Sequence, residues 1–178
     1  MSASRRQTPV PIMTDDEQRY MAFEGLVQWV SSSIAQGKRI ADATATMSPY
    51  RREDFRLLAA QVRTEHHYFA IAAYKVLEHH EWVRGLGLCP NVDFSMLDQF
   101  SASDIRDLRN MREHVVDYFR GVGRDKHRWW KETPEFKADA SASAGTHIGG
   151  RLDWKQFALA AEALLPALLA EPIPYPPR

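Results

Sequence analysis

Three side chains with complementary chemistry lie within residues 109–114, whose sequence is Arg-Asn-Met-Arg-Glu-His. Arg109 carries a permanent positive charge on a planar fork of donors, and Asn110 supplies an amide that can orient a neighbouring group. His114 can take or give a proton near neutral pH. Such a set suits chemistry on a phosphodiester, because one group can move a proton while another stabilises the charge on the phosphate.

The spacing brings only two of these side chains together if the surrounding segment is one helix. Asn110 and His114 are four residues apart and share nearly the same helix face. Arg109 points about 140° away from His114 around the helix axis. One helix therefore holds a phosphate poorly between Arg109 and His114, whereas two copies of the helix could bring these side chains together. The geometry predicts a dimer if the motif is functional.

The Arg-Asn-x-x-x-His pattern on the third long helix of a small α-bundle resembles the signature of the HEPN superfamily, many of whose members are metal-independent ribonucleases. The resemblance implies cleavage of RNA through the 2′-hydroxyl. His114 would then act as general base or acid, Arg109 would stabilise charge on the phosphate, and Asn110 would orient the imidazole. It also implies a homodimer with the site between protomers, no cofactor, and a place in a bacterial defence or toxin–antitoxin type system, with an antitoxin-like protein as a candidate partner.

A structural role for the same residues is the alternative. Arg109 can pair with Glu113 one turn further along the helix as an ordinary solvated residue. His114 can be a half-buried histidine that is hydrogen-bonded to Asn110 or to a carbonyl. In that case the chain is a non-catalytic helical dimerisation or interaction module whose partner the sequence does not identify.

Basic residues that could contact RNA phosphates lie in and shortly after the motif. Lys+Arg and Asp+Glu both number 23, so polyanion binding needs a local positive patch. Several basic residues flank Trp129-Trp130, and basic side chains interleaved with aromatic ones can bind single-stranded nucleic acid. The alternative is that both tryptophans anchor a loop on the bundle. The predicted substrate-binding residues are Arg112, Arg124, Lys126 and Arg128.

Two histidine pairs, His66-His67 and His79-His80, raise the question of a metal site. Adjacent histidines on a helix diverge by about 100°, so each pair could give one site at most one ligand. The usual helical ligand spacings, His-x-x-x-His and Glu-x-x-His, are absent among them. We therefore expect no metal site, and we interpret His66 as a core residue. The single cysteine, Cys89, excludes an intrachain disulfide.

Apolar residues that recur every three or four positions predict several helices. Thr14 and Glu17 form a predicted capping box for a helix that ends near Gly37, followed by a short helical piece over residues 39–47. The motif helix is expected to place Phe119 inward. Further helices are predicted over residues 51–83, from a cap at Ser101 or Ser103 to residue 121, and over residues 153–170 with a kink at Pro166. An irregular or hairpin segment is predicted over residues 124–150.

The predicted fold class is all-α, an up-and-down bundle of four main helices with an irregular or hairpin excursion before the last helix. We expect a flexible arm over residues 1–13, one domain over residues 14–170, and an extended proline-rich tail over residues 171–178. No signal peptide is visible at the N-terminus, and the longest apolar run, residues 157–170, is too short to span a bilayer. We expect a cytoplasmic protein with no membrane attachment.

Overall fold

A computed structural model describes residues 13–46, 52–132 and 137–174 of the chain. Most of these residues are helical, which confirms the predicted helical fold. The helices are α1 (Asp15–Thr46), α2 (Arg52–Gly85), α3 (Ala102–Glu113), α4 (Val115–Phe119) and α5 (Trp154–Ala170), with 3-10 turns η1 (Ser95–Leu97) and η2 (Lys126–Trp129). The strands are β1 (Trp130–Glu132), β2 (Lys137–Asp139), β3 (Ser143–Ala144), β4 (His147–Ile148) and β5 (Leu152–Asp153).

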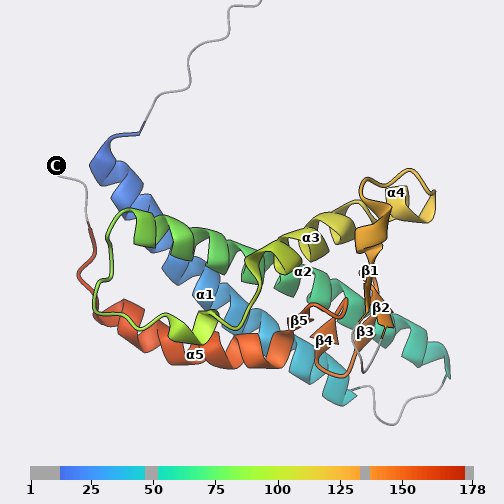
Figure 1. Ribbon diagram of the computed structural model, residues 1–178. Helices are drawn as coiled ribbons and strands as arrows, with labels where there is room; N and C mark the ends of the chain where they lie inside the picture. The colour runs from blue at the N-terminus through green and yellow to red at the C-terminus, as the bar shows by residue number, and fades with distance from the viewer. Residues whose placement is uncertain (1–12, 47–51, 133–136, 175–178) are drawn as a thin grey trace, which may run out of the picture.

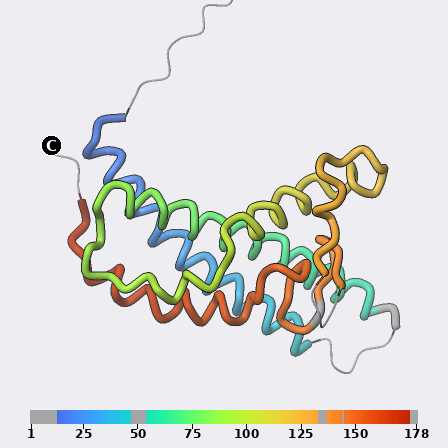
Figure 2. The backbone as a smooth tube through the Cα atoms, viewed as in Figure 1, coloured from blue at the N-terminus to red at the C-terminus, as the bar shows by residue number. Residues whose placement is uncertain are grey.

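Three long helices, α1, α2 and α5, form the body of the molecule (Figure 1). Their contacts bury side chains such as Leu26, Phe69 and Leu164 completely. After α2 the chain turns at one end of the bundle, passes η1 along α5, and then returns to α3 (Figure 2). Helix α3 packs chiefly on α2, so the predicted up-and-down arrangement of four helices around one core is not confirmed.

Helix α1 begins with the predicted capping box. The backbone N–H of Thr14 donates to Glu17 Oε2 at 2.8 Å, and the N–H of Glu17 donates to Thr14 Oγ1 at 3.3 Å. The predicted helix end near Gly37 and the separate piece over residues 39–47 are wrong, because α1 continues through both. Gly37 is buried, and a Cβ there would lie 2.9 Å from the Cβ of Ala158 in α5. This glycine allows two helices to approach closely instead of ending one.

The helix that carries the motif is shorter than predicted. Ser101 caps it by accepting a hydrogen bond from the N–H of Asp104 at 3.2 Å. Helix α3 then ends at Glu113, and the short α4 follows after a break at His114, whose backbone has φ −104° and ψ 26°. The predicted inward position of Phe119 is also wrong, since this residue is 69% exposed.

The segment before the last helix forms hairpins, one of the two forms predicted for it. Strands β1 and β2 pair antiparallel with Trp130 opposite Asp139, and β3, β4 and β5 form a second antiparallel sheet. Trp129 is buried and stacks on Tyr118 with the ring centroids 4.8 Å apart. Trp130 is 51% exposed, so only the first of the two tryptophans anchors the segment.

Helix α5 begins where the sequence predicts it. The Asp153 carboxylate accepts hydrogen bonds from the backbone N–H groups of Lys155 and Gln156, each at 3.0 Å. The helix then continues through Pro166 to its end. These cap contacts satisfy N–H groups that a helix start otherwise leaves without partners.

Two predictions at the chain ends lie partly outside the described residues. Of the predicted arm only Met13 is described, and of the predicted tail only residues 171–174, which are not helical. No helix within the described ranges has both the length and the apolar character that crossing a membrane requires.

The histidines of α2 lie against the rest of the molecule, and burial lowers the pKa of each one. His66 is 4% exposed, and its Nδ1 lies 2.9 Å from Ser143 Oγ, so the predicted core position of His66 is confirmed. Burial, together with the nearby charge of Arg112, lowers the pKa of His66 to about 4.

We predict that His66 makes the fold acid-sensitive. Above the ordinary histidine pKa of 6.5, neither the folded nor the unfolded state binds this proton. Between that value and about 4 only the unfolded chain binds it, so stability falls as the pH falls. From about pH 7.5 to about pH 5, His66 should lower the free energy of unfolding by about 2 kcal/mol. Urea denaturation of wild type and His66→Asn, whose amide can still bond Ser143, should show a smaller pH difference in the variant. Equal pH dependence would contradict the prediction.

A second prediction concerns the contact between α1 and α5. The Gly37→Leu substitution should lower the free energy of unfolding by roughly 1–3 kcal/mol, because its side chain overlaps Ala158. Gly85→Ala is the matched control, since a Cβ at Gly85 meets nothing within 4 Å and should leave stability unchanged or raise it by up to about 1 kcal/mol. Equal stability of the two variants in urea denaturation would contradict the close approach at Gly37.

Candidate functional site

An open cleft of about 560 Å³ lies where α3, α4 and the segment after them meet. Asn110 lines it from α3, and His114 lines it from the break between α3 and α4. Arg124 and Arg128 line it from the segment that follows. Four of the seven predicted site residues therefore share one cleft. Lys126 is exposed on η2 and does not line it.

The break in the helix leaves His114 available to a ligand. Its side chain is 67% exposed, and its Nδ1 lies 3.7 Å from Asp117 Oδ2. Its backbone N–H donates to the carbonyl oxygen of Asn110 at 3.1 Å, which keeps the two residues together at the end of α3. An acid or base must reach the proton that it moves, and this imidazole faces open space with a carboxylate beside it.

Arg109 lies outside the cleft. Its guanidinium donates to Asn110 Oδ1 at 2.9 Å and pairs with Glu113 Oε1 at 3.1 Å. It also lies 5.7 Å from the centroid of the Tyr74 ring on α2, within the range of a cation–π contact. These contacts direct the guanidinium toward α2, so the chain does not bring Arg109 and His114 into one cavity.

Arg112, a predicted substrate-binding residue, makes internal contacts. It is 9% exposed, and its guanidinium donates to the carbonyl oxygens of Ala140 at 3.0 Å, Ser141 at 3.4 Å and Arg63 at 3.0 Å. Burial lowers its pKa to about 10, partly opposed by the charge of Asp139. The side chain ties α3 to α2 and to the segment after β2, a role that the sequence pattern did not predict.

The cleft carries charges of both signs. Arg124 and Arg128 are outnumbered by the three carboxylates at positions 107, 117 and 125 that line the same cleft. Arg128 Nη1 lies 3.1 Å from Asp107 Oδ2, so one of the two arginines of the cleft is already paired with a carboxylate. This arrangement supplies a proton-transfer group but little net attraction for a phosphate.

Other reactive groups offer no competing centre. Among the described residues, no group of three or more His, Cys, Asp or Glu side chains is placed to hold a metal ion. Cys89 is buried, and burial raises the pKa of its thiol to about 11, which keeps it protonated near neutral pH.

A second hollow lies on the other side of α4, and the sequence analysis missed it. Its volume is about 550 Å³, and Val115 and Phe119 of α4 line it opposite Tyr68 of α2. Val115 and Phe119 are four residues apart, a spacing that predicts a core-facing stripe. In the structure this stripe borders an open groove, because α4 extends beyond the end of α3 (Figure 1).

We predict a large structural effect for Arg112 and a small one for Arg128. Arg112→Ala leaves three carbonyls without their charged donor and should lower the free energy of unfolding by roughly 2–4 kcal/mol. Arg128→Ala removes an exposed ion pair with Asp107 and should cost less than about 1 kcal/mol. The check is urea denaturation of both variants; a similar loss in each would show that Arg112 does not hold the elements together.

No protein-family model, curated protein or solved structure matches this chain. The resemblance to the HEPN superfamily therefore depends on the motif of Arg109, Asn110 and His114 and on its helical setting. What these residues do has to be inferred from their own geometry.

Proposed function

We propose that this chain is a HEPN-like cytoplasmic protein that cleaves RNA as a homodimer without a metal, with an up-and-down helical bundle as its scaffold. The observation that supports this most is the exposed imidazole of His114 in an open cleft beside Asn110. The same proposal places the protein in a bacterial defence or toxin–antitoxin type system, with an antitoxin-like protein as its partner.

His114 is the proton-transfer group in this proposal. A neutral imidazole accepts the proton of a ribose 2′-hydroxyl, and the oxygen then attacks the adjacent phosphorus. The bond to the 5′-oxygen breaks, that oxygen takes up a proton, and a 2′,3′-cyclic phosphate remains. The Asp117 carboxylate lies beside this imidazole, with Oδ2 3.7 Å from Nδ1.

In this proposal Arg109 of a second copy of the chain supplies the stabilising cation. Arg109 is held toward α2 by Glu113 and Tyr74 and does not line the cleft of its own His114. Val122 lines the cleft and is 70% exposed, an apolar surface that a second copy could cover. Arg109 of one copy would then stabilise the phosphate beside His114 of the other.

The first test is metal-free cleavage of mixed single-stranded RNA in the presence of EDTA. Wild type should release fragments that end in cyclic phosphate, whereas His114→Ala should be at least a hundredfold slower, since general acid–base catalysis contributes about 10²–10⁴-fold. The exposed His127 on η2 supplies the control His127→Ala, which should keep the wild-type rate. Equal cleavage by wild type and His114→Ala, or no cleavage by either, would remove the catalytic proposal.

A mixing experiment tests the two-chain site. Arg109→Ala and His114→Ala proteins should each be inactive alone, but a mixture that has exchanged subunits should regain part of the wild-type activity. The reason is that a mixed dimer contains one site with both Arg109 and His114. If wild type is active but the mixture of the two variants regains no activity, the site lies within one chain.

A non-catalytic interaction module is the second candidate. The Arg109–Glu113 pair at 3.1 Å is a common contact of a solvated helix surface, and it favours this alternative. The alternative predicts that substitutions of Arg109 and His114 alter only stability or association. In that case an affinity pull-down would identify a protein partner while RNA remains intact.

A further inference from the structure

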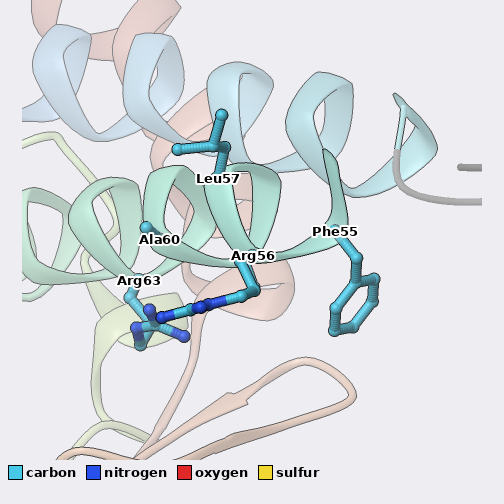
Figure 3. Close-up of a pocket in the computed structure, with 6 residues that line it drawn as sticks. Phe55, Arg56, Leu57, Ala60 and Arg63 are labelled. Carbon is cyan, nitrogen blue, oxygen red and sulfur yellow. The ribbon is translucent and has the colours of Figure 1, made fainter. Parts of the chain in front are cut away.

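The groove on the far side of α4 continues along α2. Ala60 and Arg63 border the groove and also a neighbouring hollow of about 630 Å³ at the start of α2. Figure 3 shows the Arg56 and Arg63 side chains extending toward one another along this hollow. The two hollows together make one surface, the α2–α4 groove, which runs from Phe55 to α4.

The charge of the α2–α4 groove differs from that of the cleft. Its described lining contains arginines and His67 but no carboxylate. The guanidiniums of Arg56 and Arg63 make no hydrogen bond or ion pair with any other described residue. Arg112 adds a buried positive charge at the groove wall. Burial and Arg112 lower the pKa of the His67 imidazole, partly opposed by the charge of Glu113 outside the lining. This chain of zero net charge therefore has a local positive surface at the α2–α4 groove.

Exposed aromatic rings accompany these charges. Tyr68 is 56% exposed and Phe119 is 69% exposed, and both line the groove beside Arg63. Phe55 is 48% exposed at the other end. Arginines that follow a sugar–phosphate backbone, with aromatic rings on which unstacked bases lie, are the means by which proteins bind single-stranded nucleic acid.

We propose that the α2–α4 groove binds a single-stranded RNA segment, with its phosphates at Arg56 and Arg63 and its bases stacked on Tyr68 and Phe119. A duplex does not present its base faces to such rings, and an acidic peptide gains nothing from two exposed rings beyond ordinary apolar contact. The groove thus provides the local positive surface that the cleft with its three carboxylates does not provide.

This inference rests on the proposed function, and it describes how an RNA substrate in the groove reaches His114. Val115 lines the groove and His114 lines the cleft, so adjacent residues face the two sides of the start of α4. A strand held in the groove would pass around the start of α4 to bring a ribose to the imidazole.

The test measures binding without cleavage. Fluorescence anisotropy of a short fluorescein-labelled single-stranded RNA is recorded with the full-length His114→Ala protein and with added substitutions. Arg63→Ala should weaken binding about tenfold, and Tyr68→Ala about fivefold to a hundredfold. Both side chains are exposed, so the variants should keep the wild-type circular dichroism spectrum and urea midpoint.

Matched controls lie elsewhere on the surface. Arg84→Ala removes an exposed arginine near the other end of α2, and Trp130→Ala removes an exposed ring outside the groove. Both should bind RNA like the parent protein. No binding, an equal loss in all four variants, or tighter binding of polyglutamate than of RNA would overturn the proposal. Failure of the ribonuclease proposal alone would leave the binding pattern intact, because no variant in this series depends on cleavage.

Discussion

The buried guanidinium of Arg112 connects α3, which lines the cleft, to α2 and to the segment after β2, which line the groove. It projects from α3 and donates to a carbonyl of α2 at Arg63 and to carbonyls at Ala140 and Ser141. Burying a charge is costly unless its donors find acceptors, so these three contacts of the Nη groups favour keeping the elements together. Since Arg112 fixes the end of α3, it also fixes where α4 begins and where His114 lies.

Proton transfer and phosphate binding, which the sequence motif assigns to one set of residues, fall on two different surfaces around α4. The cleft with Asn110 and His114 contains a proton-transfer group among two arginines and three carboxylates. The α2–α4 groove carries exposed aromatic rings and two arginines, Arg56 and Arg63, whose guanidiniums have no partner among the described residues, and its described lining contains no carboxylate. Electrostatic attraction acts over several ångströms, whereas proton transfer needs contact, so a binding surface beside the reacting group is compatible with both.

The parts of the fold that follow from local rules could be predicted from the sequence. The Thr14–Glu17 capping box, the start of α5 and the helical class depend on neighbours in the chain. Gly37 was misassigned as a helix end because its role is a contact with Ala158, more than a hundred residues away. The break at His114, the internal contacts of Arg112 and the groove beside Phe119 likewise depend on tertiary contacts. Periodicity shows that Phe119 belongs to an apolar stripe, but it does not show whether a partner covers that stripe.

If one RNA strand occupies the groove and reaches His114 at the start of α4, both regions must respond to the same binding event. Nuclear magnetic resonance of isotope-labelled protein, titrated with a short non-cleavable RNA carrying 2′-O-methyl riboses, tests this. We expect the signals of Arg63, Tyr68, Phe119 and His114 to shift together along one binding curve. If the signals of these residues do not change, or if only the His114 signal changes, RNA does not bind along the groove.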